Sequence, residues 1–275
     1  MSEYQYYEFI ALDQPLTQSQ LREVRAISSR AQLTPTSFVN QYHWGDFKGN
    51  PHKFLEKYYD AMLYYANWGT RRFMAKISGD ALDMKLARLY CTDGESGVEM
   101  TSIRTGFVFD FVSNTDDPEG YDQMEQPLSP LIPVREALEA GDLRPLYIGW
   151  LASVAAGERD EDETEPPLPP GMNKLPAPLK ALARFLRIDD DLLDAAAKGS
   201  ERAEDQWQAL KPWLAQIPPK RKDDLLLELM TGDPSSTAAQ LRRAFNKYRK
   251  TLPRKTAKKG TRTVDQLLRE AGMRN

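Results

Sequence analysis

The chain contains few of the residues from which enzymes and metalloproteins build their sites. Its 275 residues include one cysteine, Cys91, and two histidines, His43 and His52. One cysteine excludes an internal disulfide and a structural zinc site made of thiolates, and two histidines are too few for a histidine-rich metal site. No Walker-type loop, dinucleotide fingerprint, nucleophile elbow or zinc-binding helix motif occurs. The sequence therefore predicts no cofactor and no metal site, and it contains no recognisable catalytic motif.

Long apolar runs are also missing. The longest, LYIGWLASVAA from Leu146 to Ala156, is far shorter than the roughly 20 residues needed to cross a bilayer. The N-terminal segment MSEYQYYEF lacks the basic and apolar regions of a signal peptide. Together with the single cysteine, which fits a reducing compartment, these features lead us to expect a soluble cytoplasmic protein with no membrane partner.

The first 157 residues alternate between strand and helix patterns. Phe107, Phe109 and Phe111 recur at period two, and Asn50-Pro51 provides an N-cap followed by a proline that can begin a helix. We expect strands over 4–12, 37–44, 70–77 and within 98–112, and helices over 17–30, 51–66, 81–90, 133–140 and 143–156. This order predicts an α+β protein whose N-terminal part is a mixed α/β sandwich with one small sheet.

From residue 179 onward, only helical patterns occur. The preceding segment has six acidic residues between Glu158 and Glu165 and then a group of prolines, a composition typical of a solvated, extended linker. The sequence thus predicts four parts: an α/β domain over 1–157, an acidic, Pro-rich linker over 158–178, a helical bundle over 179–250, and a basic tail with a short terminal helix over 251–275.

Charge is divided unevenly along the chain. Residues 1–165 carry 15 Lys and Arg against 27 Asp and Glu, whereas residues 166–275 carry 22 against 13. Ten cations lie within 21 residues near the C-terminus: Arg242, Arg243, Lys247, Arg249, Lys250, Arg254, Lys255, Lys258, Lys259 and Arg262. On a helix, Leu241, Phe245 and Tyr248 would face inward and leave a basic outer face. Such a face favours binding to a polyanion such as nucleic acid.

Two alternatives for this basic region stay open. It can be a solvated terminal helix with a loose tail, which charge alone keeps soluble. It can also pair with the acidic run of residues 158–165, so that the chain neutralises its own cations. A further acidic run, Asp189-Asp190-Asp191, precedes a helix and is better explained by capping than by metal binding.

Two N-terminal segments carry weaker functional signals. In YHWGDFKG, His43 is a candidate general base that Asp46 would orient, although a strand end and turn explain the same residues. In NWGTRR, Trp68, Arg71 and Arg72 are a candidate anion or partner surface. If that segment is a strand, however, the two arginines point to opposite faces of the sheet and cannot grip one anion.

Several segments have a recognisable pattern when taken together: YQYYEF, YHWGDFKGNP, NWGTRR, GDLRPLYIGWLA and KDDLLLELMTGDP, followed by RTVDQLLREAG. The chain resembles, over nearly its whole length, a family of bacterial proteins without an assigned function. The resemblance implies a bacterial origin and carries no catalytic residues with it.

These observations lead to three hypotheses. The first is a non-enzymatic binding or adaptor protein whose basic C-terminal region contacts nucleic acid or an acidic protein. The second is an enzyme of unknown reaction with its site around His43, Asp46 and Arg71. The third is a structural subunit of a larger bacterial assembly.

Overall fold

The alternating apolar residues of the N-terminal strands build the two faces of one antiparallel sheet. In the computed structural model, which describes residues 3–115, 127–202, 206–232, 234–252, 257 and 259–274, the sheet has seven strands in the order β2-β3-β1-β4-β5-β7-β6. Their bounds are β1 Gln5–Ile10, β2 Gln32–Leu33, β3 Ser37–Tyr42, β4 Ala61–Ala66, β5 Arg71–Ser78, β6 Gly97–Ile103 and β7 Gly106–Ser113. The α+β class is confirmed, but the sheet is larger than the expected small one.

Two strands are missing from the sequence analysis: the two-residue β2, and β4, where we expected the helix after Asn50 to continue to residue 66. Helix α2 ends at Tyr58, and the next six-residue strand is buried at every position and pairs with β1 and β5. A strand covered on both faces is apolar throughout, so its periodicity cannot be told from that of a buried helix. The other expected strands are confirmed within a few residues, and the run 98–112 is the hairpin of β6 and β7.

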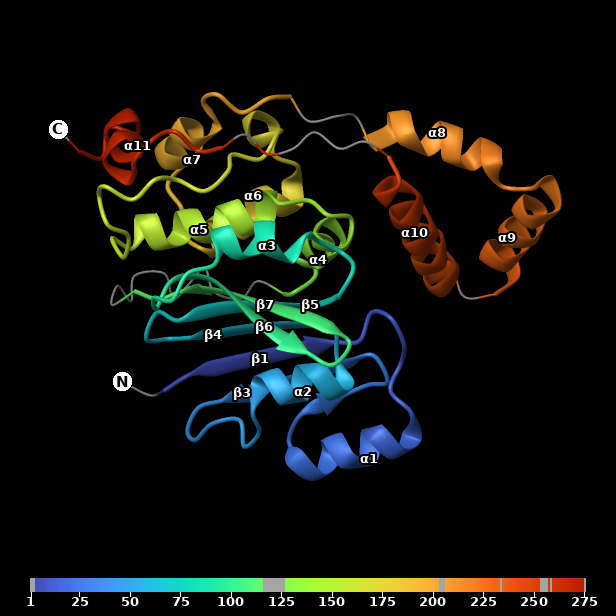
Figure 1. The fold of residues 1–275 in the computed structure, drawn as a ribbon. Helices are drawn as coiled ribbons and strands as arrows, with labels where there is room; N and C mark the ends of the chain where they lie inside the picture. Colours follow the sequence, from blue (N-terminus) through green and yellow to red (C-terminus); the bar gives the residue numbers. More distant parts are fainter. Residues whose placement is uncertain are drawn as a thin grey trace.

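Helices cover both faces of the sheet (Figure 1). One face is covered by α1 (Gln18–Ile27) and α2 (Pro51–Tyr58), which pack over Phe9, Phe38 and Met62. The opposite face carries the larger core and a second layer: α3 Met84–Ala87, η1 Arg88–Tyr90, α4 Ile132–Glu139, α5 Arg144–Ala155, η3 Met172–Lys174, α6 Ala177–Phe185, α7 Asp190–Ala197 and α11 Val264–Glu270. We call the sheet and these helices the body.

Helix α5 is the centre of the larger core. It is buried along almost its whole length and lies so close to the sheet that a Cβ atom on Gly149 would be 2.6 Å from the Cβ of Val98. Only glycine permits this approach without a shift of β6. Among the described helices, none is long and apolar enough to cross a membrane.

Helices α6, α7 and α11 belong to the body, whereas the sequence analysis placed them beyond a linker. Leu182, Leu192 and Leu267 share one core with the sheet residues. The segment 158–178 is not uniformly solvated either, because Glu165 and Met172 are buried. Hydrophobic periodicity identifies these helices but cannot tell which partner covers their apolar faces.

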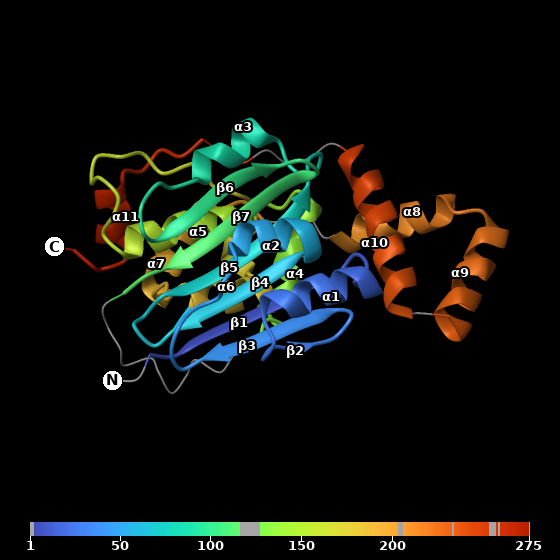
Figure 2. The ribbon, with the colours of Figure 1, turned by 90° about the horizontal axis from the view of Figure 1, so that it is seen from below.

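The remaining helices α8 (Gln206–Gln216), α9 (Pro219–Thr231) and α10 (Pro234–Lys250) stand beside the body, and we call them the arm (Figures 1 and 2). The chain enters the arm after Glu201, whose carbonyl accepts a hydrogen bond from Gly171 N at 2.6 Å. It returns to the body at Gly260, where a Cβ atom would be 2.0 Å from the Glu165 carbonyl oxygen. The arm is therefore an insertion that the body holds at both ends.

An ion pair between the partly buried Arg262 and the buried Glu165 fixes the returning chain. Arg262 donates to both carboxylate oxygens of Glu165, with Nε–Oε1 3.1 Å and Nη2–Oε2 2.8 Å, and the Tyr147 hydroxyl donates to Oε2 at 3.0 Å. Arg262 Nη1 also donates to the Ala195 carbonyl in the last turn of α7. We call these contacts the clasp. Burial and the nearby Glu165 carboxylate raise the pKa of Tyr147 well above its usual value, so its proton stays in place.

Among the described residues, the clasp and a second ion pair join the acidic run to the C-terminal segment. Arg274 lies 2.6 Å from the Glu161 carboxylate, and the backbone forms a bridge between Thr164 and Thr263. The acidic run thus folds back on the C-terminal segment through Arg262 and Arg274, as one of the alternatives from the sequence states.

Breaking the clasp should destabilise the protein strongly. In Arg262→Met, the buried Glu165 carboxylate loses its counter-charge, and such losses cost about 3–5 kcal/mol. Urea unfolding at neutral pH measures this cost, and the double variant Arg262→Met/Glu165→Leu should recover much of it because no charge is left buried. Arg274→Met, which removes an exposed arginine, serves as the control and should change little. Equal stability of Arg262→Met and Arg274→Met would contradict the role of the clasp.

Candidate functional site

Helix α10 has the inward and outward faces that its sequence predicts. The Phe245 ring packs on Trp213 of α8 with centroids 5.2 Å apart, and Gln216 Nε2 donates to the Tyr248 hydroxyl at 3.3 Å. These contacts fix the rotation of α10 about its own axis. They also leave the opposite side of the helix, which carries the cations, away from α8.

The outward side of α10, by which we mean the side turned away from α8, presents Arg243 and Lys247 one helical turn apart, and both are exposed. Arg249, two residues after Lys247, lies on a different side of the helix, and its guanidinium is 5.9 Å from the centroid of the inward-facing Phe245 ring. Arg243 also reaches the body, where its Nη1 is 3.3 Å from Oδ1 of Asp13. The described part of α10 therefore brings together Arg243 and Lys247, which are four residues apart in the sequence.

The other candidate cations fall into three groups. Lys259 is exposed at the point where the chain returns to the body. Arg262 belongs to the clasp, so its charge is already paired inside the molecule. The side chains of two candidates and the whole of three more lie outside the described part of the chain: Arg242, Lys250, Arg254, Lys255 and Lys258.

His43 and Asp46 do not meet in the geometry of a base and its orienting acid. The His43 ring contacts Tyr4, with centroids 5.4 Å apart, whereas Asp46 accepts a hydrogen bond from the Tyr7 hydroxyl at 2.9 Å. Tyr4 packs against the larger core and Tyr7 belongs to the smaller core, so the two side chains are turned toward opposite faces of the sheet. Asp46 also accepts from the Phe47 N–H at 2.6 Å, as expected for a turn residue.

Arg71 and Arg72 point to opposite faces of β5, as strand geometry predicts. Arg71 Nη1 lies 3.3 Å from the carbonyl of Phe185 at the end of α6, and Arg72 pairs with Asp110 on the other face. Arg71 and Arg72 therefore cannot both bind the same anion. Trp68 in the preceding turn is 45% exposed and is available to a partner, but neither arginine is oriented beside it by a described contact.

The sequence analysis missed a polar cluster of Asp110, Arg72 and His52 on the sheet face that carries the smaller core. Asp110 on β7 is only 2% exposed, and it accepts from Arg72 and from His52 Nε2, which is 3.2 Å from Oδ2. Burial acts to raise the pKa of Asp110, but the hydrogen bonds from His52 and Arg72 outweigh it and hold the pKa below its usual value. The signal in the sequence was a single acid within the apolar run FVFDFV.

This cluster is built like a structural ion pair. With Nε2 donating to Asp110, the His52 nitrogen left to exchange a proton with a substrate is Nδ1, and Nδ1 is buried without a hydrogen-bond partner in the described structure. A general base must reach its substrate within hydrogen-bond distance. The arrangement therefore favours a role for Arg72 and His52 in neutralising a buried carboxylate.

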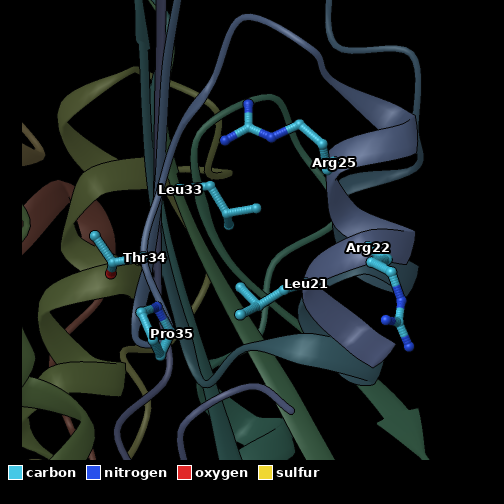
Figure 3. A pocket seen from close by; sticks show the side chains of 6 residues that line it. All are labelled: Leu21, Arg22, Arg25, Leu33, Thr34 and Pro35. Carbon is cyan, nitrogen blue, oxygen red and sulfur yellow. The ribbon is translucent and has the colours of Figure 1, made fainter. Parts of the chain in front are cut away.

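A hollow of about 310 Å³ lies between α1 and the β2–β3 turn (Figure 3). Leu21 and Leu33 point into it, and Arg25 extends over it from α1. Nη1 of Arg25 donates to the backbone carbonyls of Ser29 at 3.0 Å and Ala31 at 2.8 Å. This guanidinium is thus already used to fix the chain after α1.

Within the described residues, no three His, Cys, Asp or Glu side chains lie close enough together to hold a metal ion. Comparison of the chain with protein-family models, with curated proteins and with solved structures gives no match.

The Asp110 cluster predicts a specific pH dependence. Because the pKa of Asp110 is lowered in the folded state, its stabilisation is fully present above the unfolded value of about 3.9 and is lost as the pH falls through the lower folded value. Asp110→Asn should therefore be less stable than the unaltered protein at pH 7. The difference in free energy of unfolding between the two proteins, measured by urea unfolding at a series of pH values, should become smaller below about pH 4. A gap that stays constant down to pH 3 would show that the carboxylate charge is not what stabilises the cluster.

The thiol of Cys91 should be unreactive at neutral pH. Burial raises its pKa to about 11, so almost none of the nucleophilic thiolate is present, and the thiol donates weakly to the Ala87 carbonyl at 3.6 Å. Ellman's reagent at pH 7.5 should react slowly with the folded protein and rapidly once it is unfolded in urea. Equal rates in the two states would contradict the burial of this thiol.

Proposed function

We propose that the protein is a non-enzymatic binding protein whose arm contacts a polyanion, with nucleic acid as the ligand class. The observation that carries the proposal is the pair of exposed cations Arg243 and Lys247 on the outward side of α10. The backbone phosphates of nucleic acids are recognised by such cations without any need for base-reading motifs.

The surroundings of the arm support the proposal. Residues 206–250 carry nine Lys and Arg against four Asp and Glu, and no acidic residue occurs between Pro234 and Arg262. The first 165 residues, which form most of the body, carry an excess of twelve acidic residues. A polyanion is therefore repelled by the body and attracted to the arm, so electrostatic steering selects one side of the molecule.

Packing of the inward side of α10 against α8 holds the cations on its outward side in position to bind phosphates. Because Phe245 and Tyr248 hold α10 against α8, Arg243 and Lys247 are presented in a fixed relation to each other. Two cations on one face of a helix can contact neighbouring phosphates at a lower entropy cost than cations on a flexible chain.

Binding should be measured by fluorescence anisotropy with labelled single-stranded RNA, single-stranded DNA and duplex DNA over a salt series. We expect binding at low salt that weakens as salt rises. The double variant Arg243→Gln/Lys247→Gln should bind more weakly. Because it loses about two phosphate contacts, the slope of log affinity against log salt should become less steep by ~0.7–0.9 for each contact.

The matched control is Lys53→Gln/Lys180→Gln, which removes the same charge from exposed sites on α2 and α6 of the body. The control should leave the slope of the plot unchanged. Absence of binding at low salt, or equal loss in both double variants, would remove the proposal. Co-purification of acidic proteins without nucleic acid would instead identify a protein as the partner.

A further inference from the structure

The contact between the arm and the body involves one of the cations proposed to bind phosphate. Arg243, on α10, has its Nη1 3.3 Å from Oδ1 of Asp13, which lies just beyond the end of β1. The two side chains are 54% and 42% exposed, so both are open to solvent and to a ligand. A carboxylate here occupies the position that a phosphate oxygen would take on the same guanidinium.

The carboxylate of Asp13 is held rigidly on the body. Arg135 of α4 donates to it with Nη2–Oδ2 2.7 Å and Nη1–Oδ1 3.4 Å. Arg135 is itself buried, and its Nε donates to the Lys76 carbonyl at 2.7 Å. The backbone N–H of Asp13 donates to the Asp60 carboxylate at 2.9 Å. Asp13 is thus a fixed negative charge at the side of the body that faces α10.

We propose that Asp13 acts as an internal competitor for the polyanion and restrains the arm in the unliganded protein. This inference rests on the proposed function, because the competition requires that Arg243 binds phosphate. A polyanion that engages Arg243 must first displace the Asp13 carboxylate, so the free energy of that contact is subtracted from binding. Engagement of the ligand also releases the arm from this point of the body.

The size of the effect follows from the exposure of the pair. Exposed ion pairs contribute modestly, which corresponds to about a two- to five-fold change in an equilibrium constant. Asp13→Asn keeps the size of the side chain and a hydrogen-bonding oxygen for Arg135 while it removes the charge. Affinity for the polyanion should therefore rise about two- to five-fold, and the salt dependence should steepen as Arg243 becomes fully available.

The binding test uses the full-length protein and the labelled nucleic acid that it binds most tightly, over the same salt series. The matched control is Glu161→Gln, which removes one carboxylate that is paired with Arg274 near the C-terminus and away from the arm. Tighter binding by Asp13→Asn together with unchanged binding by Glu161→Gln supports the inference. Unchanged or weaker binding by Asp13→Asn overturns it and leaves the proposed function in place. An equal gain in both variants assigns the effect to net charge and also overturns it.

A second measurement tests the restraint without a ligand. Spin labels are placed at Met230→Cys on α9, where the side chain is 86% exposed, and at Lys53→Cys on α2, in a background with Cys91→Ala. The distribution of distances between the labels should broaden when Asp13→Asn is added. Identical distributions with and without this substitution would overturn the restraint. If no nucleic acid binds at all, the proposed function fails in the anisotropy series, and the label distances still decide whether Asp13 holds the arm.

Discussion

The ion pair between Glu165 and Arg262 connects the acidic N-terminal region of the chain to the basic C-terminal region. Bidentate hydrogen bonds and the Tyr147 hydroxyl satisfy the Glu165 carboxylate, and Arg262 also donates to the end of α7. A buried charge pair of this kind brings little net stability, but removal of one partner is costly. Its main consequence is therefore positional, because it fixes where the chain returns after the arm.

This constraint separates the roles of the cations near the C-terminus. Arg262 is paired with Glu165 inside the body, whereas Arg243 and Lys247 lie on the arm, which is held at its two ends. Glu165 of the acidic run therefore neutralises Arg262, where the basic segment returns to the body. The arm keeps its positive charge beside a body of the opposite sign, which is the arrangement expected when attraction to a polyanion must be confined to one surface.

The fold and the site differ in how far the sequence predicts them. The strands at Gln5–Ile10 and Arg71–Ser78 were expected, over 4–12 and 70–77, and the opposite directions of Arg71 and Arg72 followed from strand geometry alone. Strand β4 was mistaken for helix because both of its faces are buried. His52 and Asp110 are 58 residues apart in the chain, and no local pattern could have joined them.

Local spacing and composition by themselves determined the helices of the C-terminal region, the capping residues Asn50 and Asp189, and the basic outward side of α10. These features depend on neighbours within a few residues, so the sequence contains them directly. Only the tertiary structure decided that α6, α7 and α11 cover the sheet, that Arg262 pairs with the buried Glu165, and that Arg243 reaches Asp13. Those contacts depend on which apolar surfaces meet over long separations, and periodicity carries no information about the partner of a face.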